Sequence, residues 1–401
     1  MPKWDYCIAE IDPMKKVLII HPEGNVLNNP SIKALIDLLQ NHGISVSIHC
    51  QGSPVRMDHA SGVILRPWGK IYGRIKRIAL DYLASGLVSY ALILIELLFV
   101  REKYDLIIGV DRQGIIEAYL WWRLTRVPYV FWSFEIMFLA ETSVKYKRLE
   151  KIASKFASLW FVQDKLRASK LRFENDLANS NCRLVPLASA GVGKFSDKRL
   201  RDELGIPKSK KVAMLMGSLS KWSMAFEIIN TVDHWTSDWV LVVHDRYGKT
   251  DAFMRKINPS LTGFVQSKIF ISNKAVDCVD DMGFILSGVT VGLVFYKPTF
   301  GSPYTGNNLA FLGLASGKVA TYWRYGIPVI MNSIGEYSDI TISCCAGVVM
   351  SDNLNDLPDI LAQHEFSSLG INAKRVFERM LDFDLYRDRV WADLTSVAKV
   401  R

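Results

Sequence analysis

Three consecutive residues in the stretch "GLASGKVATYWRYGIPVI" could bind a phosphate group. Ser316, Gly317 and Lys318 come directly before a short helical pattern, and Gly326 ends that pattern before an apolar strand. The first turn of a helix has unpaired backbone N–H groups and the positive end of the helix dipole, so anions bind there. Serine is a favoured N-cap, glycine allows close approach to the backbone, and lysine adds positive charge. The alternative is an ordinary capped helix with a surface lysine.

The spacing around Gly317 excludes two common nucleotide-binding loops. The ATP-binding pattern G-x-x-x-x-G-K-[ST] needs glycine where this chain has Leu312, and serine or threonine where it has Val319. The dinucleotide pattern G-x-G-x-x-G should follow the first strand, but the loop after residues 16–21 contains only one glycine. The stretch is therefore neither an ATPase loop nor a dehydrogenase loop.

Short apolar runs separated by helical patterns predict an α/β protein with parallel sheets. In the first half, strands are expected at 16–21, 44–50, 104–110, 128–134, 158–163 and 182–187. In the second half they are expected at 211–217, 238–245, 268–273, 289–296, 327–332 and 346–351. The segment 188–211 is rich in glycine, lysine and serine and has no long apolar run, so we interpret it as the connection between two domains. Two doubly wound domains form a cleft where the ends of their strands face each other, and ligands bind there.

The order of these segments resembles GT-B glycosyltransferases of the group 1 type, which use nucleotide-sugars. "SGKVATYWRYGIPVI" is similar to their donor motif S-K-x-x-E-Y-x-x-x-G-x-P-V-I, and "KVAMLMGSLSKW" to the first strand and loop of their donor domain. The resemblance covers most of residues 16 to 390. It implies two Rossmann-like domains facing a central cleft: an acceptor-binding domain at 1–192, completed by a C-terminal helix at 386–401, and a donor-binding domain at 193–385.

The resemblance also implies a set of donor-binding residues. The loop 217–222, with Gly217 and Lys221, lies against the donor phosphates in this family, although Lys221 could equally be a solvated lysine in a turn. Lys221, Lys318 and the helix dipole could together stabilise the leaving diphosphate without a metal ion. His244 and Arg246 are weaker candidates.

The chain departs from the family at two positions. The family often has two glutamates eight residues apart, the second of which contacts the donor ribose, but this chain has Gly313 and Thr321 there. Thr321, Tyr322 or the Asn307–Asn308 pair could take over that contact.

Three carboxylates that follow apolar strands are candidates for the catalytic base. Glu135 follows the strand at 128–134, and apolar neighbours could raise its pKa so that it activates or orients an acceptor hydroxyl. Asp111 and Glu23 are the alternatives, and each could also be a surface carboxylate. Asp382 and Asp384 form a D-x-D, which we expect to cap the turn before the last helix, because no donor-domain strand precedes it. We expect no metal site and no cofactor, since the nucleotide-sugar is itself the substrate.

Residues 66–100 could contact a membrane. At helical spacing, residues 66–82 place Lys70, Arg74 and Arg77 beside an apolar stripe, and the run 83–100 contains a single charge, Glu96. The net charge of +9 favours acidic partners such as anionic lipids. A helix at 83–100 could be buried, inserted in the membrane surface, or long enough to cross a bilayer.

The expected protein is a glycosyltransferase that moves a sugar to a lipid-linked or polysaccharide acceptor at the cytoplasmic membrane face. No signal peptide is recognised, and the six cysteines lack metal-binding spacing, so a peripheral protein of the cytoplasm is expected. Nucleic acid is not an expected partner, because no nucleic-acid-binding module is recognised. Two alternatives are a GT-B-fold nucleotide-sugar epimerase and a non-catalytic subunit that binds lipid or partner proteins.

Overall fold

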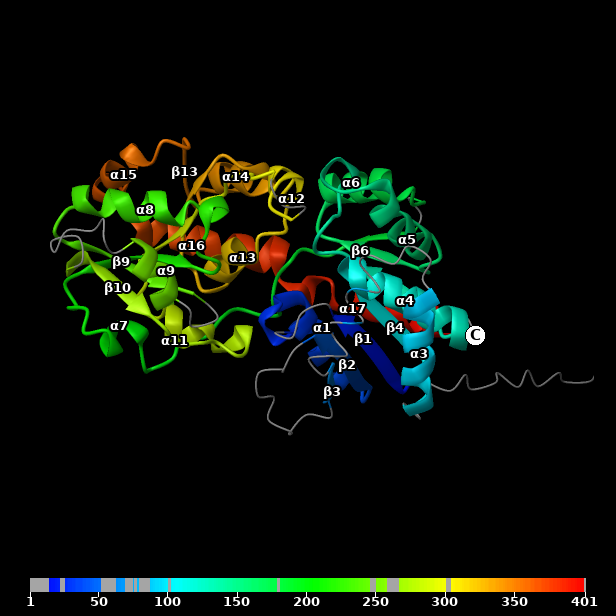
Figure 1. Cartoon of the computed structure of the whole chain (residues 1–401). Coiled ribbons are helices and arrows are strands. Elements are labelled where there is room, and N and C mark those ends of the chain that lie inside the picture. Colours follow the sequence, from blue (N-terminus) through cyan, green and yellow to red (C-terminus); the bar gives the residue numbers. More distant parts are fainter. Residues whose placement is uncertain are drawn as a thin grey trace, which may run out of the picture.

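The structure is a computed structural model, and it describes residues 14–21, 26–51, 63–68, 75, 78, 87–99, 102–178, 181–245, 250–257, 267–300 and 304–399. Two parallel β-sheets lie in two halves of the molecule, each flanked by helices (Figure 1). The expected α/β fold with two doubly wound sheets is therefore confirmed.

The first sheet has the strand order β3-β2-β1-β4-β5-β6-β7, and every neighbouring pair is parallel. Its strands are β1 (Lys16–His21), β2 (Ser45–Gln51), β3 (Val63–Trp68), β4 (Leu106–Val110), β5 (Tyr129–Trp132), β6 (Trp160–Val162) and β7 (Cys182–Leu184). Its helices are α1 (Pro30–Asn41), α3 (Leu87–Phe99), α4 (Asp111–Thr125), α5 (Val144–Lys155) and α6 (Lys165–Asn175). The chain reverses its direction of winding beside β1, which places a ligand crevice at the carboxyl end of that strand.

The second sheet has the strand order β10-β9-β8-β11-β12-β13, again all parallel. Its strands are β8 (Lys211–Met216), β9 (Trp239–His244), β10 (Ile269–Ser272), β11 (Val291–Val294), β12 (Val329–Asn332) and β13 (Gly347–Met350). Its helices are α7 (Leu200–Glu203), α8 (Ala225–Thr231), α9 (Thr250–Ile257), α11 (Met282–Leu286), α12 (Asn307–Ala310), α13 (Gly317–Arg324), α14 (Gly335–Ser343), α15 (Leu357–Gln363) and α16 (Phe366–Val376). Here the winding reverses beside β8, between β9 and β11.

The last helix, α17 (Arg387–Ala398), packs on the first half of the molecule. It contacts α1 and β4, and its Val390 and Leu394 are buried in the same core as Val17 of β1. The chain thus returns to the N-terminal sheet after completing the second one. The two sheets lie on either side of the expected boundary at 192/193, which itself stays a prediction.

One expected element is wrong in part, and others lie outside the described residues. Residues 66–68, where we expected a basic helix to begin, belong to strand β3, which pairs with β2 along its whole length. The sequence did not predict β3 because basic residues follow it closely. Lys70, Arg74 and Arg77 lie outside the described residues. Among the residues that are described, no helix is long and apolar enough to cross a membrane.

The two halves are joined by hydrogen bonds between side chains of one and backbone of the other. The Ile136 N–H donates to Oδ1 of Asn308 at 2.8 Å, and Nδ2 of Asn308 donates to the Ile136 carbonyl at 2.7 Å. The carboxylate of Asp164 caps α6 and accepts from the Leu314 N–H at 2.7 Å. Because Asn308 is buried, removing its side-chain amide would leave the backbone groups of Ile136 without these partners inside the junction, so Asn308 helps to hold the two halves in one arrangement.

Arg167 of α6 makes hydrogen bonds to both halves at this junction. It is 1% exposed, and its guanidinium donates to the side chain of Gln163 at 2.7 Å and to the backbone carbonyl of Phe134. On the other half it donates to the Phe311 carbonyl at 3.2 Å and to Asn308. A buried guanidinium is tolerated only when its donors are paired, so Arg167 fixes the position of the Phe134 turn relative to the segment around Asn308.

Candidate functional site

A cleft of about 290 Å³ lies between the two halves, at the carboxyl ends of their strands. The first half contributes Asp111 and Glu135 to its lining, and the second contributes Gly217, Lys318 and Thr321. With Gly317, which also lines it, six of the nine residues expected to act at the site lie along one cavity. It is the position where doubly wound sheets bind ligands, because strand order reverses beside both β1 and β8.

Helix α13 begins at this cleft with a well-supported N-terminus. Ser316 is the N-cap, and its Oγ accepts the Val319 N–H at 3.3 Å and lies 2.6 Å from the hydroxyl of Tyr296. Ser316 is 1% exposed and does not line the cleft, whereas Gly317 does. Ser316 therefore holds the helix end in place, and Gly317 presents that end to a ligand. Thr321, one turn later, donates its hydroxyl to the Gly317 carbonyl at 2.7 Å.

Lys318 reaches the cleft through space left by Gly217. Gly217 directly follows β8 and has φ of +96°, a backbone conformation that favours glycine. A Cβ added to Gly217 would lie 2.7 Å from Cε of Lys318. Because Gly217 has no side chain, the side chain of Lys318 can pass over it. The position of the lysine therefore depends on a glycine that is far away in the sequence.

Two aromatic rings hold the ammonium group of Lys318. Its Nζ lies 4.9 Å from the ring centroid of Trp222 and 5.4 Å from that of Tyr296. The two rings are within 4° of parallel, and their centroids are 6.0 Å apart. Both aromatic residues line the cleft, and the sequence reasoning missed both. The available signals were the position of Trp222 in the loop after β8 and of Tyr296 at the end of an apolar run.

Three residues expected to bind the donor do not line the cleft. Besides Ser316, Lys221 is exposed in the loop after β8, at the start of a short helical turn, Lys221–Ser223. Tyr322 is wholly buried, and its hydroxyl donates to the Met214 carbonyl at 2.8 Å. Tyr322 is therefore a core residue and cannot replace the missing ribose contact. Asn308 cannot make the ribose contact either, because its side-chain amide is hydrogen-bonded to the backbone of Ile136 across the junction.

Asp111 positions the turn that carries Glu135. Asp111 has φ of +52°, which is unusual for a residue with a side chain, and its Oδ1 accepts the N–H groups of Phe134 at 2.6 Å and Glu135 at 2.8 Å. Backbone strain of this kind often occurs at functional sites. Asp111 and Glu135 both line the cleft, and His21 at the end of β1 joins them there, which the sequence did not predict.

Buried positive charge lies close to these carboxylates. Burial lowers the pKa of Arg167, and the negative charges of Glu135, Asp164 and Asp111 oppose that effect. Of these three carboxylates, Glu135 raises the pKa of Arg167 most strongly. The guanidinium that joins the two halves thus also sets the electrostatic environment of the candidate base. Glu23, the third candidate base, lies outside the described residues.

His244 contributes an uncharged imidazole to the cleft. Burial lowers its pKa to about 4, although the nearby Asp245 carboxylate opposes this shift. Its Nδ1 lies 2.9 Å from the Ser272 hydroxyl. His244 is therefore neutral near pH 7 and adds no positive charge to the cleft. Arg246 lies outside the described residues.

The structure gives a steric reason for one departure from the family pattern. A Cβ added to Gly313 would lie 2.0 Å from Oδ2 of Asp164, and Gly313 has φ of +52°. A glutamate at 313 is therefore incompatible with this junction, because a carboxylate from the other half already occupies the space. The D-x-D at 382–384 has the expected local role: Asp382 accepts the Asp384 N–H at 2.9 Å, and Asp384 pairs with Arg387 at 2.6 Å.

Solved structures with the same fold are glycosyltransferases and related enzymes. HepE from Anabaena, solved in complex with UDP-glucose, is 13% identical with a TM-score of 0.68, covering 95% of this chain and 99% of that one. Sucrose-phosphate synthase from Thermosynechococcus elongatus is 13% identical with a TM-score of 0.67, covering 94% and 98%. WaaG, a glycosyltransferase involved in lipopolysaccharide biosynthesis, is 13% identical with a TM-score of 0.61, covering 93% and 99%. No protein-family model and no curated protein matches the sequence. At these identities the likeness shows the fold, and the chain has the GT-B fold.

We predict that Gly217→Ala weakens diphosphate binding by about tenfold, because the new Cβ displaces Lys318 and a charge-assisted contact is lost. The strained backbone should also cost about 1 kcal/mol of unfolding free energy. Calorimetric titration with nucleoside diphosphates measures the first effect. Gly205→Ala is the matched control, since Gly205 also has positive φ, +67°, but has nothing within 4 Å of the added Cβ. Equal binding losses in both variants would contradict the role of Gly217.

The low pKa of His244 predicts an acid-sensitive fold. Between about pH 6.5 and 4 the unfolded chain binds a proton at His244 that the folded chain does not, so stability falls as the pH falls through this range. The loss amounts to at most about 3 kcal/mol. Urea unfolding at pH 7 and pH 4.5 should therefore show a smaller pH effect in His244→Gln than in the wild type. Identical pH effects in the two proteins would refute this prediction.

Proposed function

We propose that this protein is a glycosyltransferase that moves a sugar from a nucleotide-sugar to an acceptor. The observation that carries the proposal is the pairing of Lys318 with the start of α13 at the cleft, opposite Glu135. One side of the cavity suits an anionic leaving group and the other carries a carboxylate that can act on a hydroxyl. That HepE was solved with UDP-glucose supports a nucleotide-sugar as the donor.

In this proposal the second half of the molecule stabilises the leaving diphosphate. Negative charge develops on the diphosphate as the bond to the sugar breaks, and preorganised positive groups stabilise that charge. Lys318 supplies a full charge, and the N–H groups at Gly317 supply the helix dipole. Trp222 and Tyr296 keep the ammonium group in place, so little reorganisation is needed. Such a site needs no metal ion for this task.

The first half would bind and activate the acceptor. Glu135 stands at the cleft on a turn held by Asp111, and it can accept a proton from, or orient, the attacking hydroxyl. Asp111 serves as a positioning residue, because its Oδ1 is occupied by two backbone N–H groups. Both halves must stay in register for the reaction, and the contacts of Arg167 and Asn308 maintain that register.

We further propose that the acceptor is lipid-linked or a growing polysaccharide, at the cytoplasmic face of a membrane. Helix α3 carries exposed apolar side chains on its outer face: Val88, Leu94 and Ile95 are 42%, 48% and 46% exposed. Ile75 and Ile78, from the basic segment that precedes α3, are 47% and 45% exposed. Exposed apolar groups beside basic residues in the sequence favour peripheral attachment to anionic lipid.

The donor is tested by thermal stabilisation with a panel of nucleotide-sugars that begins with UDP-glucose. A true donor at about a hundred times its Kd should stabilise the wild type by about 2.7 kcal/mol, and Lys318→Met should lose most of this effect. Lys221→Met is the matched control, since it removes an exposed lysine near the same cleft and should behave like the wild type.

The other candidate functions give different results in the same assay. No stabilisation of the wild type by any nucleotide or nucleotide-sugar would refute the enzyme proposal and favour a non-catalytic binding subunit. Conversion of a nucleotide-sugar into its epimer without an acceptor would favour an epimerase instead.

Membrane attachment is tested by sedimentation with vesicles rich in phosphatidylglycerol. We expect Leu94→Ser/Ile95→Ser to reduce the bound fraction several-fold, because burial of two large apolar side chains in lipid is lost. Phe173→Ser is the control, since Phe173 is an exposed apolar residue on α6, 79% exposed, outside this surface. An unchanged bound fraction in the double variant would rule out this surface as the site of attachment.

A further inference from the structure

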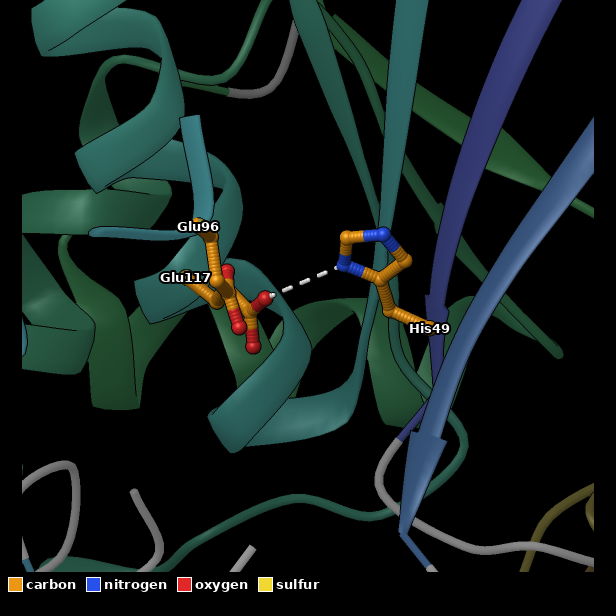
Figure 2. A group of neighbouring side chains, drawn as sticks. All are labelled: His49, Glu96 and Glu117. Carbon is orange, nitrogen blue, oxygen red and sulfur yellow. Dashed lines mark ion pairs between the residues drawn. The ribbon is translucent and has the colours of Figure 1, made fainter. Parts of the chain in front are cut away.

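A buried group of metal-ligating side chains lies in the first half, away from the cleft. His49 comes from β2, Glu96 from α3 and Glu117 from α4, and the three side chains point toward one another (Figure 2). One ligand atom from each lies within 4.8 Å of the other two, and His49 Nδ1 is 3.6 Å from Glu117 Oε1. None of the three lines the cleft. This site therefore does not depend on the proposed function.

His49 is the unusual member of the group. It is 3% exposed, and neither of its ring nitrogens has a hydrogen-bond partner among the described residues. Buried polar side chains are nearly always hydrogen-bonded, so an imidazole with both nitrogens unsatisfied calls for a ligand. The ring is packed edge-on against Trp121, with centroids 6.0 Å apart, and it faces Glu117. The imidazole is thus held in an orientation that presents a nitrogen to two carboxylates.

We propose that His49, Glu96 and Glu117 bind a divalent transition-metal ion of the Zn²⁺ class. One imidazole nitrogen and two carboxylate oxygens form a mixed ligand set that suits such an ion, with a water molecule as the fourth ligand. Around one ion with bonds of about 2 Å, neighbouring ligand atoms lie a little over about 3 Å apart. The three side chains thus need only a small inward movement to coordinate it. The sequence did not predict this site, because its members are far apart in the chain and meet only in the fold.

The site would fix α3 to the body of the first half. Glu96 is the only charged residue in the apolar run 83–100, and it points inward while Leu94 and Ile95 are exposed. A bound ion would join α3 to β2 and α4 at that point. The metal would therefore set the orientation of the exposed apolar face of α3. This role would explain why an otherwise apolar helix contains one acidic residue.

The main alternative to a metal ion at this cluster is positive charge from an arginine of the chain. Arg66 is the register partner of His49 in the neighbouring strand β3. If the chain neutralises its own carboxylates, the cluster is an internal ion pair and binds no metal. The two possibilities differ in metal stoichiometry, which can be measured directly.

The experiment uses the full chain, treated with chelator and then titrated with Zn²⁺ by calorimetry, with metal content measured after dialysis. We expect one Zn²⁺ per chain in the wild type and binding about 10- to 100-fold weaker in His49→Gln and Glu96→Gln. His42→Gln is the control, since His42 lies exposed at the end of α1 against Trp391, and it should bind like the wild type. Less than about a tenth of an equivalent in the wild type, or equal binding in all variants, would overturn the proposal.

X-ray absorption of the zinc-loaded wild type keeps the test decisive if a variant does not fold. We expect nitrogen and oxygen ligands only, with the scattering pattern of one imidazole. Sulfur in the coordination shell would overturn the proposal, because it would assign the ion to cysteines such as the exposed pair Cys344 and Cys345.

Discussion

The arrangement of the two halves depends on one buried positive charge, the guanidinium of Arg167. Burying an ion is costly unless all its donors are paired, and Arg167 finds its partners on both sides of the junction. One donor holds the carbonyl of Phe134, whose N–H is in turn held by Asp111. The same charge therefore aligns the turn that carries Glu135 with the segment that leads into α13.

The two halves of the molecule line the cleft with groups of opposite charge. Lys318 and the start of α13 provide positive potential on one side, while Asp111 and Glu135 provide carboxylates on the other. The lysine is confined by Gly217 behind it and by two aromatic rings beside it. A charge that is already in place stabilises a transition state better than one that must move there, because no reorganisation is needed.

The sequence predicted the elements well and their contacts less well. The twelve strands expected from apolar runs are all present, since such runs are typical of parallel strands buried on both faces. It missed β3, which lies beside a basic segment. At the site, the N-cap role of Ser316 follows from local helix chemistry, whereas the cleft positions of Gly317 and Lys318 depend on the fold. Tyr322, which we expected to bind the donor, is buried in the core instead. The side of α13 that faces the core depends on the packing of the sheet below it.

By itself the sequence determined what is local or periodic: the alternation of strands and helices, the capped start of α13, and the absence of the spacing that ATP or dinucleotide loops need. Only the tertiary structure decided which distant residues meet. In the fold, Lys318 packs over Gly217, and Asn308 is hydrogen-bonded to Ile136. Asp164 occupies the space that a side chain at Gly313 would need. Periodicity acts over one turn or one strand, whereas these contacts depend on how complete sheets and helices pack, which no short stretch of sequence encodes.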